Sequence, residues 1–326
     1  MRLLVTGGAG FIGSNYVRMV LGTTDDHVTV LDALTYAGNL ASLSDVAGDA
    51  RFRFVHADIT DREAVLHAVD GHDAIVHFAA ESHVDRSIVS PDEFVHTNCD
   101  GTNVMCDVAR RVGVERFVHV STDEVYGSIE SGSWTVEHIL EPNSPYSASK
   151  ASSDLLARSY FRTHGLPVCV TRCSNNYGPY HFPEKVIPLF VTNLLDGHKV
   201  PLYGDGLNVR DWLHVDDHCR GIQAVLEKGQ AGEAYNLSGR CELSNLELVG
   251  RLLDATERDA SLVRHVPDPR GGAHDRRYSA DDSRARALGW APRVPFDEGL
   301  AATVEWFRAN RAWWEPLRAR VDTLSF

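Results

Sequence analysis

The stretch Gly7-Gly8-Ala9-Gly10-Phe11-Ile12-Gly13 decides the fold of this chain. It follows a short apolar run at residues 3–6, and its glycines have the spacing G-x-x-G-x-x-G. This spacing allows a tight turn, lets the backbone approach a pyrophosphate closely and directs amides at a helix N-terminus toward negative charge. Glycine turns also arise by chance, but the strand pattern before this loop and the helix pattern after it favour a dinucleotide-binding crevice.

Short apolar runs alternate with helical patterns through the first half of the chain. Near-continuous apolar character is typical of parallel strands that helices cover on both faces. The sequence therefore predicts an α/β fold with a Rossmann-like, doubly wound parallel sheet. The predicted strands are residues 3–6, 28–31, 52–55, 74–78, 117–120 and 168–171.

A smaller C-terminal lobe is predicted from Ser174 onward, where proline and glycine turns interrupt the alternation. We expect residues 1–173 to form the dinucleotide-binding domain and residues 174–326 to form mainly a substrate-binding lobe. Residues 210–227 again resemble a strand followed by a helix, so some segments are expected to return to the first domain. A last helix is predicted over residues 296–314, with its tryptophans as packing residues.

Asp32 ends the second predicted strand, 19 residues after Gly13. A carboxylate at this place can bind both ribose hydroxyls and repels a 2′-phosphate, and Ala33 supplies no arginine to accept that phosphate. NAD is therefore expected rather than NADP. Asp58-Ile59 and residues 78–82 follow the next two strands, so they are expected to line the same crevice.

The amino-acid composition limits the classes of partner that this chain is expected to bind. The 326 residues carry 32 Lys and Arg against 45 Asp and Glu, a net charge of -13, which disfavours binding to nucleic acid or an anionic membrane surface. No apolar run approaches a membrane span, and the N-terminus shows no signal-peptide pattern. The six cysteines contain no Cys-x-x-Cys pair and are expected to be reduced, so a cytoplasmic location is expected.

Tyr146-Ser147-Ala148-Ser149-Lys150 places a phenol and an ammonium four residues apart, on one face of a helix if Ser144 caps it and Pro145 takes its first position. Tyr146 is a candidate base for a substrate hydroxyl that loses hydride to NAD. We expect Lys150 and the positive nicotinamide to favour phenolate and lower the phenol's pKa. A chance Tyr-x-x-x-Lys pair is common, but its place after a nucleotide fold favours the catalytic interpretation.

Thr122-Asp123-Glu124 follows the fifth predicted strand directly, again at the carboxyl end of the sheet. A solvated loop would tolerate adjacent carboxylates, but an acid and base pair gives both a chemical role. Repulsion between them would separate their pKa values, leaving Asp123 protonated and Glu124 ionised.

Two other patterns could indicate a metal site or a nucleophilic serine, but neither is expected to serve as one. His214 and His218 have the spacing of metal ligands on a helix, but redox chemistry by NAD needs no metal, and none is expected. Ser121 lacks the G-x-S-x-G elbow of a nucleophilic serine. For His77, His83 and Asp85, packing and backbone hydrogen bonds are the expected roles.

With these motifs, the chain resembles the extended short-chain dehydrogenase/reductases, and among them the dTDP-glucose 4,6-dehydratase family. The Thr122-Asp123-Glu124 triplet is the most specific match, because related epimerases lack both carboxylates and related decarboxylases keep only the glutamate. The matching segments run nearly end to end: the glycine loop and residues 34–39, 77–87, 121–128, 146–150, 175–179, 183–185, 203–206 and 210–212.

The resemblance implies a lyase that keeps NAD bound while it converts dTDP-glucose to dTDP-4-keto-6-deoxyglucose. It implies that Tyr146 takes the C4 hydroxyl proton, Glu124 the C5 proton, and that Asp123 protonates the leaving C6 hydroxyl. Thr122 would bond the C4 oxygen and Lys150 the nicotinamide ribose. The alternatives are another NAD-dependent nucleotide-sugar epimerase or decarboxylase, or a non-catalytic NAD-binding sensor.

The resemblance also implies the remaining site residues and a homodimer formed by helices near residues 91–112 and 145–163. Arg210 is the expected diphosphate partner, because its guanidinium fork matches phosphate oxygens; a surface pair with Asp211 is the alternative. The chain departs from the family's Arg-Pro-Gly-His-Asp pattern at residues 270–278, where the turn is altered. The expected cofactor-binding residues are Gly7, Gly10, Phe11, Ile12, Gly13, Asp32, Leu34, Thr35, Asp58, Ile59, Phe78, Ala79, Ala80, Ser82, Thr97, Tyr146, Lys150 and Asn176. The expected substrate-binding residues are Ser82, Thr122, Asn175, Lys185, Val186, Pro201, Tyr203, Arg210, Asn245, His274 and Arg276.

Overall fold

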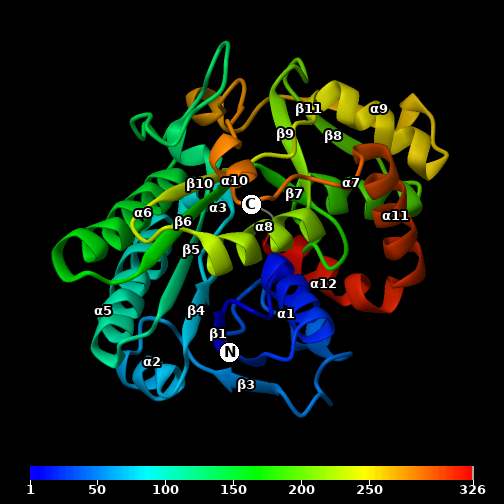
Figure 1. The fold of residues 1–326 in the computed structure, drawn as a ribbon. Helices are drawn as coiled ribbons and strands as arrows, with labels where there is room; N and C mark the ends of the chain where they lie inside the picture. Colours follow the sequence, from blue (N-terminus) through cyan, green and yellow to red (C-terminus); the bar gives the residue numbers. More distant parts are fainter. Residues whose placement is uncertain (325–326) are drawn as a thin grey trace.

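A seven-stranded parallel sheet forms the centre of the computed structural model, which describes residues 1–324 (Figure 1). The strand order β10-β6-β5-β4-β1-β2-β3 confirms the doubly wound sheet, and all six strands expected from the sequence are present. The order reverses between β1 and β4, where open sheets bind their ligands. The strands are β1 (Arg2–Thr6), β2 (His27–Asp32), β3 (Phe52–His56), β4 (Ala74–His77), β5 (Arg116–Thr122), β6 (Val168–Cys173) and β10 (Ala234–Leu237).

Helices cover both faces of this sheet, which explains why its strands are mainly apolar. On one face, α1 (Phe11–Thr23), α8 (Val215–Lys228) and α10 (Ser283–Ala287) contribute to one apolar cluster. On the other, a second cluster includes α2 (Arg62–Val69), α5 (Thr102–Val112) and α6 (Pro145–His164). Short helices α3 (Val84–Val89) and α4 (Pro91–Val95) and a π-helix at His96–Gly101 lead into α5.

A second lobe begins after β6 and has its own apolar cluster. It contains a three-stranded sheet of β11 (Glu242–Ser244), β9 (Val209–His214) and β7 (Asn175–Tyr177), and a two-stranded sheet of β12 (Val263–Val266) and β8 (Val200–Tyr203). Helices α7 (Val186–Leu195) and α9 (Asn245–Thr256) pack beside these strands. Between them, α8 and β10 return to the large sheet, so the chain crosses between the lobes more than once.

The C-terminal helix expected over residues 296–314 is wrong as a single element. The structure has two helices, α11 (Phe296–Ala309) and α12 (Arg311–Leu324), which meet at Asn310. The break lets Trp314 fold back, donating from its indole nitrogen to the Phe307 carbonyl at 2.7 Å while remaining 1% exposed. Burial of this large side chain favours the turn over a continuous helix.

None of the helices within residues 1–324 combines the length and apolar character that crossing a membrane requires.

Candidate active site

The glycine loop joins β1 to α1 and packs against the end of β4. Gly7 has φ +68°, and a Cβ there would lie 2.6 Å from the Ala79 amide nitrogen. A Cβ on Gly13 would lie 2.3 Å from the Gly7 carbonyl oxygen. Side chains at either position would therefore clash with backbone, so the close turn needs glycine. This cradle opens at the N-terminus of α1, which fits a dinucleotide phosphate.

Asp32 ends β2 at the edge of this cradle. Its carboxylate accepts from the Ala9 amide at 2.9 Å and from the Leu34 amide at 2.8 Å. Burial raises the pKa of Asp32, while these two amides act to lower it. Leu34 supports the carboxylate through its main chain and does not line the cavity, so its expected contact with the cofactor stays a prediction.

One cavity of about 460 Å³ runs from the glycine loop into the second lobe. It brings together residues from the ends of β1, β2, β4, β5 and β6, and residues from α6, α7 and the second lobe. A long cavity lined by both lobes fits a dinucleotide beside a second ligand. The expected residues that line it are Gly7, Gly10, Phe11, Ile12, Gly13, Asp32, Thr35, Asp58, Ile59, Phe78, Ala79, Ala80, Ser82, Thr97, Thr122, Glu124, Tyr146, Lys150, Asn175, Asn176, Lys185, Val186, Pro201, Tyr203, Arg210, Asn245 and His274.

Helix α6 positions Tyr146 and Lys150 as the sequence predicts. Ser144 caps the helix by accepting from the Ser147 amide at 3.1 Å, and Pro145 occupies its first turn. Both Tyr146 and Lys150 line the cavity. They therefore share the helix face that points to the site.

Lys150 is not among the groups that lower the pKa of the Tyr146 phenol in this structure, and the expected effect of a bound nicotinamide on that pKa stays a prediction. Burial raises the pKa of Tyr146 well above its usual range, and the nearby Glu124 carboxylate raises it further. The Lys150 ammonium donates to the Val120 carbonyl at 2.8 Å, and burial lowers the pKa of Lys150 to about 8. A main-chain carbonyl, rather than the phenol, is therefore the hydrogen-bond partner of the ammonium.

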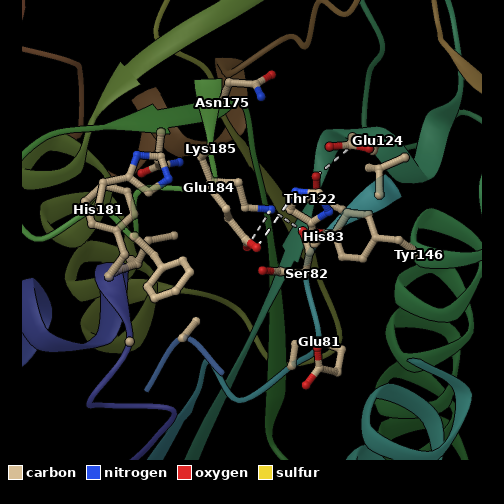
Figure 2. A pocket seen from close by; sticks show the side chains of 18 of the residues that line it. Glu81, Ser82, His83, Thr122, Glu124, Tyr146, Asn175, His181, Glu184 and Lys185 are labelled. Carbon is tan, nitrogen blue, oxygen red and sulfur yellow. Dashed lines mark hydrogen bonds and ion pairs between the residues drawn. The ribbon is translucent and has the colours of Figure 1, made fainter. Parts of the chain in front are cut away.

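The two carboxylates lie on a single 3₁₀ turn at Asp123–Tyr126, directly after β5. Thr122 caps this turn: its hydroxyl accepts from the Glu124 amide at 3.2 Å and donates to Asp123 Oδ1 at 3.4 Å. Figure 2 shows Thr122, Glu124 and Tyr146 grouped on one side of the pocket, with Lys185 reaching in from the other. Asp123, unlike the other expected catalytic residues, does not line the cavity in this conformation and is 2% exposed, so its contact with the substrate stays a prediction.

Burial is the main cause that raises the pKa of both carboxyls. For Asp123 the rise is large, because the charges of Glu124 and Asp211 add to the cost of burial. For Glu124 the Arg210 guanidinium opposes the rise. These directions agree with a protonated Asp123 beside a more readily ionised Glu124.

Arg210 reaches the cavity from β9. Its guanidinium donates to the Asp275 carbonyl at 2.9 Å and lies 4.1 Å from the centre of the Tyr278 ring. Asp211 does not pair with it, since that carboxylate accepts from Ser238, Gly239 and Cys241 instead. Arg210 thus lines the cavity and bonds to main-chain carbonyls rather than to the Asp211 carboxylate, and its contact with a diphosphate stays a prediction.

The turn at residues 270–278 places Arg270, rather than the expected Arg276, at the cavity. Arg276 does not line the cavity; it pairs with Asp205 at 3.0 Å, and its side chain is 55% exposed, so the structure does not bring it to the site and its expected substrate contact stays a prediction. Arg270 lines the cavity and pairs with Asp85 at 2.5 Å. The departure from the family pattern at residues 270–278 was the signal in the sequence for this difference.

The list of expected site residues also omitted several polar groups in the cavity. Glu184 lies beside Lys185, with Oε2 3.9 Å from His83 Nε2. The Lys185 ammonium donates to the Ser82 carbonyl at 2.5 Å, which ties the two lobes together (Figure 2). The Pro183-Glu184-Lys185 match could have identified the glutamate. The other omitted polar or aromatic lining residues include Tyr36, Glu81, His83, Asp85, Ser121, Ser174, His181, Phe182, Phe190, Trp212, Arg270 and Tyr278.

The histidines His214, His218 and His77 each hydrogen-bond to other groups of the protein. His214 caps α8 by accepting from the Asp216 amide, and His218 pairs with Asn176 Oδ1 at 2.9 Å. His77 is buried between Thr6 and Thr102. These bonds give His214 and His218 structural roles.

Comparisons with known proteins agree with this geometry. The family model described as GDP-mannose 4,6 dehydratase matches residues 4–303. A dTDP-glucose 4,6-dehydratase of Streptomyces niveus is 57% identical over 325 residues, covering 98% of this chain and 96% of that protein. The crystal structure of DesIV, a dTDP-glucose 4,6-dehydratase of Streptomyces venezuelae with NAD bound, is 60% identical with a TM-score of 0.95, covering 97% of this chain and 100% of that one. A UDP-glucose 4-epimerase of Thermotoga maritima is 32% identical with a TM-score of 0.88, covering 95% and 100%.

Proposed function

Because the chain belongs to the GDP-mannose 4,6 dehydratase family, we propose that it is a lyase that converts dTDP-glucose to dTDP-4-keto-6-deoxyglucose with bound NAD. The observation that carries this proposal is the turn Asp123–Tyr126 beside Tyr146. Oxidation at C4 requires only a base such as Tyr146, whereas loss of water also requires an acid and a second base. Asp123 and Glu124 supply that pair.

The glycine cradle, Asp32 and Lys150 hold the cofactor in this proposal. When bound, NAD accepts hydride from C4 of the sugar, returns it to C6 and favours phenolate through its positive charge. Tyr146 takes the proton of the C4 hydroxyl, and Thr122 bonds the same oxygen. These two groups start the reaction from α6 and from the end of β5.

Elimination follows because a ketone at C4 makes the C5 hydrogen acidic. Glu124 removes the C5 proton, and Asp123 gives its proton to the C6 hydroxyl, which leaves as water. The raised pKa of Asp123 suits an acid that must keep its proton at neutral pH. After reduction at C6, a proton returns to C5.

The second lobe binds the nucleotide sugar in this proposal, while residues 1–173 bind NAD. Arg210 and Arg270 contact the diphosphate, and Lys185 and Asn175 contact the sugar. The cavity fits this division, since Arg210 and Arg270 both line it on the side of the second lobe.

We further propose a cytoplasmic homodimer. Apolar side chains are exposed on α4 and α6, which belong to the expected interface, and on α3, which comes just before it in the chain. These side chains are Ile88 and Val89 on α3, Val95 on α4 and Leu155 on α6. Exposed apolar residues that cluster in this way favour an interface between subunits. Light scattering of wild type and of Leu155→Glu tests this, and a monomeric wild type would refute it.

Product analysis tests the function. The purified protein with dTDP-glucose should release the 4-keto-6-deoxy sugar, which is measured by its absorbance in alkali and by mass loss of one water. Formation of dTDP-galactose alone would identify an epimerase. Bound NAD without turnover would identify a sensor.

A further inference from the structure

A fully buried ion pair lies next to the catalytic turn. Arg172 on β6 donates from Nε to Asp154 Oδ2 at 2.7 Å and from Nη2 to Oδ1 at 3.1 Å, and both side chains are 0% exposed. A buried guanidinium needs partners for its remaining hydrogens. Its Nη1 donates to the Tyr126 hydroxyl at 2.6 Å, so the pair holds this phenol in place.

Tyr126 is the last residue of the turn that carries both carboxylates. Its hydroxyl donates in turn to Asn236 Oδ1 on β10 at 2.9 Å, and its ring stacks on Trp134 with centroids 5.8 Å apart. The Asn236 amide also donates to the Trp134 carbonyl at 3.0 Å. Because the 3₁₀ turn is only four residues long, fixing Tyr126 also fixes Asp123 and Glu124.

The same ion pair reaches the helix that carries the phenol of the first step. Tyr146, Lys150 and Asp154 are spaced by four residues along α6, so they lie along one face of the helix. Arg172 therefore bonds at once to α6, through Asp154, and to the catalytic turn, through Tyr126. Neither Arg172 nor Tyr126 lines the cavity, and the proposed reaction gives neither a step of its own.

We propose that the Tyr126 hydroxyl is a positioning group, held by Arg172 and Asn236, that sets the Asp123 and Glu124 carboxylates against the substrate already oriented by Tyr146. Loss of water depends on this group, whereas C4 oxidation depends on it much less because Arg172 keeps its two bonds to Asp154 on α6 without the Tyr126 hydroxyl. This inference rests on the proposed dehydratase function and assigns a role to residues outside the cavity.

Tyr126→Phe tests the proposal, because it removes one oxygen and keeps the buried ring. In single-turnover experiments with the holoenzyme and dTDP-glucose, water loss should slow by about tenfold, as small misplacements of reacting groups do. Oxidation at C4 should change by less than about twofold, so reduced cofactor should accumulate. Rapid-quench mass spectrometry measures water loss, and near-ultraviolet absorbance measures the reduced cofactor.

Tyr16→Phe is a matched control. Tyr16 is also a fully buried phenol that donates to a side-chain amide, Gln223 Oε1, at 2.7 Å. Tyr16 does not line the cavity. The Tyr16→Phe variant should therefore keep the wild-type ratio between the rates of C4 oxidation and water loss, even if its melting temperature falls. If Tyr126→Phe cannot be obtained folded, Asn236→Ser tests the same bond by withdrawing the acceptor.

The positioning role is overturned if Tyr126→Phe slows both steps equally, or lowers only the melting temperature. A wild-type enzyme that released no water would instead refute the proposed function, and this inference with it.

Discussion

The Lys150 ammonium donates to the main-chain carbonyl of Val120 at 2.8 Å, inside the protein. Burial lowers its pKa from 10.5 to about 8. Between these values the unfolded chain binds a proton that the folded protein does not, so this group makes the free energy of unfolding rise with pH.

Lys150→Met should remove that rise. From about pH 8 to about pH 10.5, the free energy of unfolding of wild type should gain about 3 kcal/mol relative to the variant. Urea unfolding at several pH values measures the difference. Lys199→Met, at an exposed position, is the control and should follow wild type. A difference that stays constant with pH would contradict the buried charge.

Asp123→Asn should separate the two halves of the reaction. An amide cannot protonate the leaving hydroxyl, so water loss should slow by about 10²-fold or more. Oxidation at C4 should be much less affected, because Tyr146 is unchanged. Single-turnover mass spectrometry measures both steps, and equal slowing of the two would argue against Asp123 as the acid.

Glu124→Gln should abolish exchange at C5. The amide cannot take the C5 proton, so the product formed in deuterium oxide should lack solvent deuterium at that carbon. NMR of the product or recovered substrate measures this. Deuterium incorporation at the wild-type level would assign the base to another residue.

Asp154→Asn should strongly destabilise the fold. It leaves the Arg172 charge buried without its counter-charge, which costs about 3 to 5 kcal/mol of unfolding free energy. Asp297→Asn is the control, because it breaks an exposed pair with Arg251 and should leave stability nearly unchanged. Denaturant unfolding of both variants measures the two losses. A loss for Asp154→Asn as small as that for Asp297→Asn would show that the Arg172–Asp154 pair is dispensable for stability.

Arg270→Ala and Arg276→Ala should differ in substrate binding. Only Arg270 lines the cavity, so its loss should raise KM for dTDP-glucose by about tenfold, as for one charge-assisted hydrogen bond. Arg276 bonds Asp205 at the surface, and its loss should leave KM near the wild-type value. Steady-state kinetics of the two variants test this, and the reverse order would restore Arg276 to the site.

Local patterns predicted those parts of the protein that depend on neighbouring residues. The glycine spacing, the alternation of strands and helices and the Ser144-Pro145 helix start are of this kind, and the structure has all three. The choice of Arg270 over Arg276 depends on the path of a turn and on Asp85, which is 185 residues away. The pKa of Tyr146 depends on burial, and the break at Asn310 depends on where Trp314 packs; neither is visible in a sequence pattern.

The return of β10 to the large sheet has a consequence during synthesis on the ribosome. Until residue 237 has emerged, β6 has a bare edge and Asn236 cannot reach the Tyr126 hydroxyl. A nascent chain that stopped at residue 173 would expose an unpaired parallel strand, which invites aggregation. A fragment of residues 1–173 is therefore not expected to remain soluble on its own, although it carries most of the strands of the large sheet.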